Sequence, residues 1–141
     1  MTVYVIDASV AVKWFIANAE NETHVDHALR LLSRAQSGDV RFLQPPHWVG
    51  EVAAVLVRLA PKTAFASVHA LMALDFVDTT AHGEHYQRAI SLAIKLDHHL
   101  FDTLYHAIAL AEKAMLITAD RKYFNKAQHV GSVMMLEDFE G

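Results

Sequence analysis

Four carboxylates stand at places in this sequence where the fold could gather them into one site. Asp7 and Asp120 each directly follow a short apolar run that is typical of a buried strand. Glu51 and Asp102 lie in segments with helical periodicity. Four like charges in one pocket repel each other strongly unless a divalent cation holds them. The pattern therefore points to hard-metal chemistry, and hence to phosphoryl transfer or phosphodiester cleavage.

Each of these acids also has a simpler explanation. Asp7 and Asp120 lie between a strand and a helix, so either could be a helix N-cap. Asp102 falls in a first helical turn, where the helix dipole favours a negative charge. Glu51 borders an apolar stripe and could pair with Arg58. The residues alone leave both explanations open, although only the metal site accounts for all four acids together.

Polar neighbours accompany the two acids that follow strands. The hydroxyls of Ser9 and Thr118 could orient a carboxylate or a metal-bound water, although local backbone bonding explains them equally well. Arg121, Lys122 and Lys126 form a small basic patch directly after Asp120, where a solvated helix face is the simpler interpretation.

Other catalytic schemes find no support. The sequence has no Walker A loop, no GxGxxG, no GxSxG and no cysteine nucleophile. Ser9 stands where an aspartyl-phosphate enzyme with an Asp-x-Asp motif would have its second Asp. The ten histidines include the pairs His82/His85 and His98/His99, but no HExxH spacing and no clear third ligand. A zinc site is therefore disfavoured.

Composition predicts one globular domain over residues 1–141. Apolar residues make up 53% and charged residues 20%, which leaves enough apolar surface for a core and for association with a partner. The net charge of −4 gives no global attraction to nucleic acid. The absence of cysteine and of a secretory signal leads us to expect a cytoplasmic protein, and no apolar run is long enough to span a membrane.

Short apolar strands alternate with helices along the chain. This order predicts an α/β fold with three α/β/α layers and a central, mostly parallel sheet. We expect strands at 2–6, 40–43, 76–79, 115–118 and 132–136. We expect helices at 8–16, 22–36, 47–60, 63–74, 83–96 and 101–114, with a short one after residue 120. In such sheets ligands bind at the carboxyl ends of the strands, where Asp7 and Asp120 would lie.

Apolar residues at helical spacing predict which helix faces are buried. The predicted buried stripes are Trp48, Val52, Val55, Leu56 and Leu59 in one helix, Tyr86, Ala89, Ile90, Ala93 and Leu96 in another, and Leu104, Ile108 and Ala111 in a third.

Four segments, taken in order, resemble the motifs of a known family. VIDASVAVKWF at 5–15, PHWVGEVAAVL at 46–56, FDTLYHAIA at 101–109 and LITADRKYF at 116–124 are similar to the motifs of PIN domains, specifically of VapC-type toxins of toxin–antitoxin pairs. The resemblance covers nearly the whole chain. One departure is Ala54, where the family often has an Asn three residues after the Glu.

The resemblance implies a magnesium- or manganese-dependent endoribonuclease that is the toxin of a type II toxin–antitoxin pair. Asp7, Glu51, Asp102 and Asp120 would be the acidic, metal-binding residues. It further implies a homodimer and an antitoxin that covers the acidic groove. The RNA backbone would lie on nearby basic residues, for which Arg121 and Lys122 are the candidates.

Two other functions stay open at this stage. One is a nuclease of the same fold that acts in RNA processing or on DNA without an antitoxin, and the other is a catalytically silent interaction module whose acids are only caps.

Overall fold

A five-stranded parallel sheet forms the centre of the molecule. The computed structural model describes residues 1–16 and 22–141. The sheet order is β3-β2-β1-β4-β5, and every neighbouring pair is parallel. In that order the strands are β3 (Val77–Thr79), β2 (Val40–Gln44), β1 (Thr2–Ile6), β4 (Met115–Thr118) and β5 (Val133–Met135). The predicted α/β fold is confirmed.

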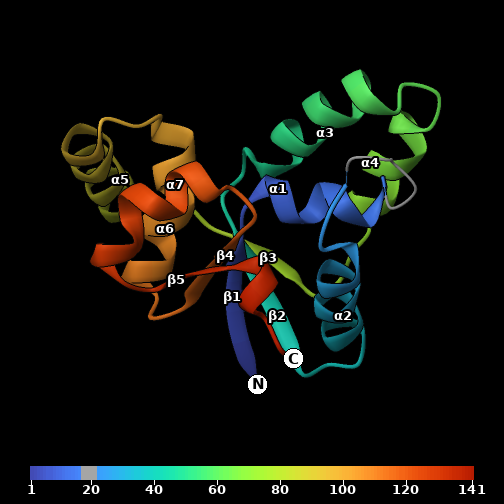
Figure 1. The fold of residues 1–141 in the computed structure, drawn as a ribbon, viewed down its shortest axis with the longest axis horizontal. Helices are drawn as coiled ribbons and strands as arrows, with labels where there is room; N and C mark the ends of the chain where they lie inside the picture. The colour runs from blue at the N-terminus through green and yellow to red at the C-terminus, as the bar shows by residue number, and fades with distance from the viewer. Residues whose placement is uncertain (17–21) are drawn as a thin grey trace.

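Helices cover both faces of this sheet. The α-helices are α1 (Ala8–Ala11), α2 (Val25–Gln36), α3 (Trp48–Leu59), α4 (Ala64–Met72), α5 (Gly83–Leu96), α6 (Leu100–Ala111) and α7 (Arg121–Ala127). Short 3₁₀ helices are η1 (Val12–Trp14), η2 (Gln128–Val130) and η3 (Leu136–Asp138). In Figure 1 the strands are seen nearly edge-on, with α5 and α6 on one side and α2 on the other.

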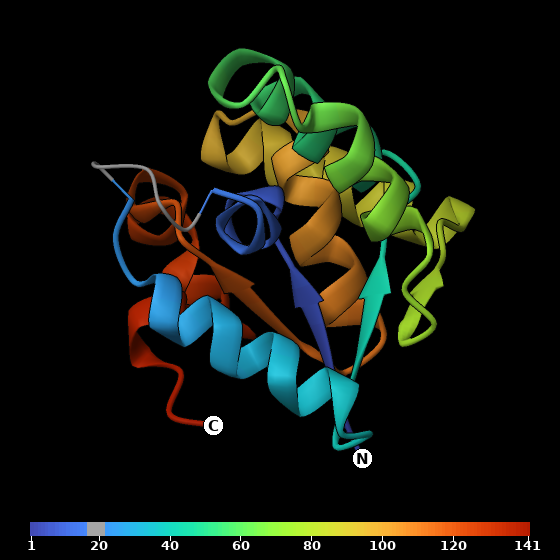
Figure 2. The ribbon, with the colours of Figure 1, turned by 90° about the vertical axis from the view of Figure 1, so that its right-hand side faces the viewer.

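The layers follow from which helices are apolar on which face. Helix α6 packs against β1, β2 and β4, and α5 packs outside α6. Helix α6 is buried almost throughout, from Thr103 to Ala109, as expected of a helix that lies between a sheet and a second helix. On the opposite face α2 contacts β2 and η1, as Figure 2 shows from the side. Helices α3 and α4 contact each other beyond α1.

A buried glutamine joins the ends of the two strands nearest the acids. The pairing of β1 with β2 runs from Thr2–Val40 to Tyr4–Phe42. Two residues further on, the fully buried amide of Gln44 accepts a hydrogen bond from the backbone N–H of Ile6 and donates one to its C=O, both at 2.8 Å. This amide satisfies both backbone groups of the residue just before Asp7, where each would otherwise be buried without a partner.

Backbone conformation explains two helix boundaries that differ from the prediction. Helix α2 begins at Val25 and not at residue 22, because His24 adopts a left-handed conformation with φ 55°. Helix α6 ends at Ala111 and not at residue 114, and Lys113 is likewise left-handed.

Two predicted stripes are partly wrong. In α5 the buried residues are His85, Ala89 and Leu92, whereas Tyr86 and Ile90 are 40% and 49% exposed. Apolar side chains such as Ile94, which is 78% exposed, also lie outside the buried face, so the apolar pattern did not fix the rotation of this helix. At the end of α3, Leu59 is 52% exposed.

No helix in the described ranges is both long and apolar enough to cross a membrane.

Candidate metal centre

Two of the acids extend from neighbouring strand ends and cap helices. Asp7 follows β1 and accepts a hydrogen bond from the N–H of Ser9 (3.1 Å) at the start of α1. Asp120 lies two residues after β4 and accepts one from the N–H of Tyr123 (3.1 Å) at the start of α7. Because each cap fixes its carboxylate, capping and membership of an acidic cluster are compatible roles.

Hydrogen bonds also join these two turns to each other. The N–H of Asp7 donates to the C=O of Ile117 (3.0 Å), and the N–H of Ala119 donates to Oγ of Ser9 (3.1 Å). The hydroxyl of Thr118 accepts a bond from the N–H of Asp120 (3.0 Å). Ser9 and Thr118 therefore fix the backbone that carries the acids: Thr118 through the local bonding considered from the sequence, and Ser9 through a bond to a residue 110 positions away.

Helix α3 contributes Glu51, which is held by α6 and not by Arg58. The buried phenol of Tyr105 donates to Oε1 of Glu51 at 2.6 Å. Nε2 of His47, the N-cap residue of α3, lies 3.4 Å from the same oxygen and 3.1 Å from the C=O of Phe101. These contacts tie the first turn of α3 to the start of α6.

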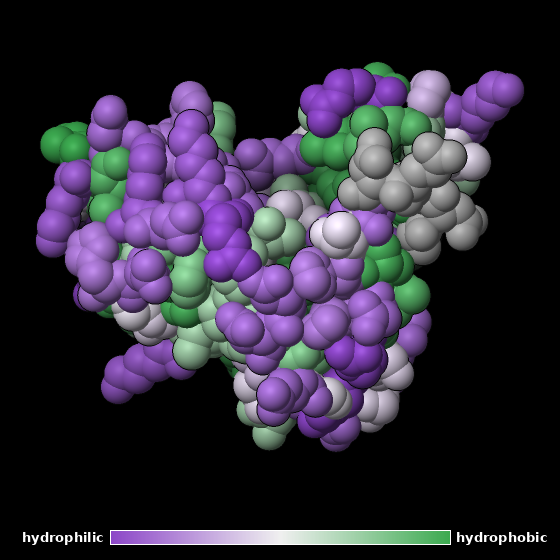
Figure 3. Space-filling view, viewed as in Figure 1, coloured by the Kyte–Doolittle hydropathy of each residue, from purple (hydrophilic) through white to green (hydrophobic). Residues whose placement is uncertain are grey.

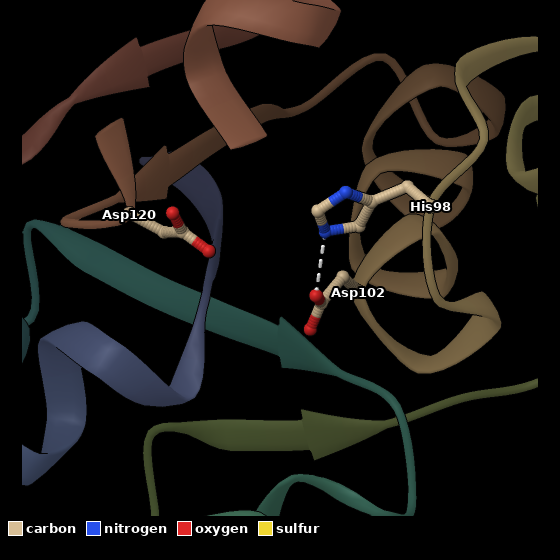
Figure 4. A group of neighbouring side chains, drawn as sticks. All are labelled: His98, Asp102 and Asp120. Atoms are coloured by element: carbon tan, nitrogen blue, oxygen red, sulfur yellow. Dashed lines mark hydrogen bonds and ion pairs between the residues drawn. The ribbon is translucent and has the colours of Figure 1, made fainter. Parts of the chain in front are cut away.

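Asp102, in the first turn of α6, lies beside His98, which the sequence analysis considered only for a zinc site and not as a partner of Asp102. Nε2 of His98 is 2.8 Å from Oδ2 of Asp102, and the His98 side chain is 7% exposed. Figure 4 shows these two side chains facing the carboxylate of Asp120. One ligand atom from each of His98, Asp102 and Asp120 can be chosen so that all three lie within 4.8 Å of one another, a spacing that one ion could bridge.

The protonation behaviour of the acids reflects their shared burial. Burial chiefly raises the pKa of Asp7 to about 6; hydrogen bonds from Ser9 oppose the rise, and the charges of Asp102 and Glu51 add to it. Burial also raises the pKa of Asp102, with further contributions from the charges of Glu51 and Asp120 against the hydrogen bond from His98. The four carboxylates therefore influence one another and form one cluster.

Glu51 behaves in the opposite way. Burial would raise its pKa, but the hydrogen bonds from His47 and Tyr105 outweigh burial and hold the pKa below its ordinary value. Burial and the charges of Glu51 and Asp7 in turn raise the pKa of Tyr105, so the phenol stays protonated and donates. Glu51 is the acid that the protein itself keeps ionised.

No lysine or arginine in the described part of the chain lies within 4 Å of any of the four carboxylates. Among these described residues, no lysine or arginine therefore neutralises the negative charge of the cluster. Carboxylate oxygens are the ligands that Mg²⁺ and Mn²⁺ prefer, so the donor set fits such an ion.

The surface is hollowed at the carboxyl end of the sheet. In Figure 3 the outline dips between the α7 side and the α3 side, at the end of the sheet where the strands point. The exposed Lys122 and the adjacent Lys126 line a pocket of about 260 Å³ together with Asp97, His98 and His99. Arg121 instead forms an ion pair with Glu137.

The search for relatives gives a family and a fold. The model of the PIN domain family matches residues 4–130. A search of curated proteins finds no match. Among solved structures, the chain is similar to VapC20 from Mycobacterium tuberculosis, described as a sarcin-ricin loop cleaving toxin, with TM-score 0.70 and 16% identity over 94% of this chain and 97% of that one.

Two further structures contain toxin–antitoxin proteins. A toxin–antitoxin complex from Klebsiella pneumoniae matches with TM-score 0.65 and 14% identity, over 96% of this chain and 98% of that one. VapBC2 from Rickettsia felis, bound to a DNA fragment from its promoter, matches with TM-score 0.66 and 12% identity, over 95% and 97%. These likenesses establish the fold. Since the family model spans most of the sequence and includes all four acids, the chain belongs to the PIN domain family.

Proposed function

We propose that this protein is a divalent-metal-dependent endoribonuclease and the toxin of a toxin–antitoxin pair. One observation carries the proposal: Asp7, Glu51, Asp102 and Asp120, from four separate elements, form one partly buried acidic cluster at the carboxyl ends of parallel strands. A PIN domain with this cluster has the groups that metal-assisted phosphodiester hydrolysis requires.

The four acids would hold one or two Mg²⁺ or Mn²⁺ ions. Such an ion, when bound, activates water and offsets negative charge on the phosphate. The chain's own contribution is to fix the ligands. The caps orient Asp7 and Asp120, and Tyr105 keeps Glu51 ionised and in place.

RNA as the substrate and an antitoxin as a partner are supported by the solved structures with this fold, which are described as a sarcin-ricin loop cleaving toxin, a toxin–antitoxin complex and VapBC2 bound to promoter DNA. The RNA backbone would approach through the hollow and meet Lys122, whereas Arg121 would have to leave Glu137 to take part. We include in the proposal that the protein forms a homodimer.

Cleavage of total RNA tests the enzymatic part. The purified protein should cut RNA in 5 mM Mg²⁺ or Mn²⁺ and not in excess EDTA, and Asp7→Asn should abolish cutting. Asp26→Asn is the matched control, because Asp26 lies exposed in the first turn of α2 away from the cluster. Full activity in EDTA, or in Asp7→Asn, contradicts the metal assignment.

Two further experiments separate the remaining functions. Inhibition by the small protein encoded next to this gene supports the toxin, whereas cleavage that no neighbouring protein inhibits indicates a PIN nuclease of RNA processing. Calorimetric titration with Mn²⁺ that shows no binding, together with no cleavage, indicates an interaction module.

A further inference from the structure

A buried histidine outside the acidic quartet contacts one of its members. His98 lies in the loop between α5 and α6, four residues before Asp102, and its imidazole packs against Tyr123 with ring centroids 4.8 Å apart. Its Nε2 is 2.8 Å from Oδ2 of Asp102 (Figure 4). Only 7% of its side chain is exposed, so the ring is largely shielded from solvent.

The contact made by the other ring nitrogen, Nδ1, indicates which of the two nitrogens carries the proton. Nδ1 of His98 is 3.3 Å from Nζ of Lys126, and that ammonium is held by the C=O of Asp97 at 2.8 Å. A lysine ammonium only donates hydrogen bonds, so Nδ1 must accept. The proton of the neutral ring is therefore on Nε2, which donates to Asp102.

We propose that His98 is a positioning residue for the metal centre: its Nε2–H fixes the Asp102 carboxylate, and Lys126 holds the imidazole in the tautomer that does so. The inference deepens the proposed function and rests on it. A hydrogen bond at Oδ2 sets the rotamer of Asp102 and leaves Oδ1 free of that bond. Partners of this kind that orient metal ligands typically change metal affinity about 10- to 100-fold.

Direct ligation is the competing role for His98, since its nitrogen lies within 4.8 Å of oxygens of Asp102 and Asp120. Ligation through Nε2 would move the proton to Nδ1. Two donors, Nδ1–H and the Lys126 ammonium, would then face each other across 3.3 Å. The observed arrangement favours positioning.

The first test compares Mn²⁺ affinities by titration calorimetry at pH 7.5, with Mn²⁺ alone as the probe. His98→Leu should weaken binding about 10- to 100-fold. His98→Gln, whose amide N–H can occupy the place of Nε2–H, should remain within a few-fold of the parent. His99→Leu is the matched control, because the neighbouring His99 is exposed. Equal affinity of His98→Leu and the parent overturns the proposal for His98 alone, whereas no binding by the parent overturns the metal centre itself.

The second test reads the tautomer directly and still applies where His98→Leu does not fold. A long-range ¹H–¹⁵N spectrum of the metal-free parent should show His98 protonated at Nε2 only. Lys126→Met should remove this preference and weaken Mn²⁺ binding several-fold. Electron spin echo spectra of the Mn²⁺-loaded parent should show no directly bound imidazole nitrogen from His98. Protonation at Nδ1, or a nitrogen coupling that disappears in His98→Gln, overturns the proposal in favour of direct ligation.

Discussion

Removing the charge of Asp7 should stabilise the metal-free protein while abolishing metal-dependent cleavage. Burial, and to a lesser degree the neighbouring acids, raise the pKa of Asp7 from its ordinary 3.8 to about 6. Each tenfold change in an ionisation constant is worth about 1.4 kcal/mol, so at pH 8 the ionised carboxylate costs the native state ~3 kcal/mol. Asparagine carries no charge and caps a helix about as well as aspartate, so Asp7→Asn should recover about 2–3 kcal/mol.

The sign of the pH dependence follows from the direction of the pKa change. Because the folded pKa is the higher one, the penalty is absent below pH 3.8, grows as pH rises, and is complete above pH 6. The advantage of Asp7→Asn should therefore fall from about 2–3 kcal/mol at pH 8 to about 1 kcal/mol at pH 4.5.

Urea denaturation in EDTA at these two pH values measures both numbers. At pH 8 the melting temperature should also rise by roughly 4–10 °C, since a domain of this size gains about 2–4 °C per kcal/mol. Asp26→Asn, which removes an exposed carboxylate paired with Arg30, should give no gain at either pH. Two results would refute the electrostatic reasoning. In one, Asp7→Asn is no more stable than the parent at pH 8; in the other, its gain in unfolding free energy over the parent is as large at pH 4.5 as at pH 8.

Four substitutions at three further positions probe the site and its supports. Tyr105→Phe removes the 2.6 Å bond to Glu51 and should cost about 1.5–3 kcal/mol in urea denaturation and weaken Mn²⁺ binding in calorimetry; unchanged Mn²⁺ affinity would show that the phenol does not orient Glu51. Gln44→Leu leaves both backbone groups of Ile6 buried without partners and should lower stability by about 2–5 kcal/mol in the same assay, whereas a loss under 1 kcal/mol would mean that water or the strand replaces the amide. Asp120→Asn should abolish RNA cleavage at parent stability, while Asp120→Ala should also lose about 1 kcal/mol with its cap; equal stabilities would argue against the capping role.

The order of strands and helices was predictable because each strand is a short apolar run between turns. The run 115–118 and the helix 83–96 were predicted with the observed bounds. Asp7 and Asp120 were also accessible to prediction, since parallel strands bring their carboxyl ends to one edge. Whether these two acids cap helices or join a cluster looked like a choice in the sequence, and the structure shows both.

The supports of the site could not be predicted, because they join residues far apart in the chain. Nothing local indicates that Tyr105 donates to a carboxylate 54 positions earlier, or that Gln44 bonds to Ile6. His98 had a local signal, its spacing of four residues before Asp102, but it precedes the helix, where that spacing does not by itself place side chains together. The rotation of α5 was missed because apolar side chains lie on its exposed side (Ile90 and Ile94) as well as on its buried side (Ala89 and Leu92).

The hydrogen bonds around the cluster divide it into two halves. Asp7 and Asp120 sit on turns that are bonded to each other through Ile117 and Ser9, so they move with the sheet. Glu51 and Asp102 sit on α3 and α6, which Tyr105 and His47 fasten together. Helix α6 also packs on β1, β2 and β4, so the two halves share the sheet as a common support. An ion bound by all four acids would therefore add a link between α3 and the sheet to the one that Tyr105 already makes between α3 and α6.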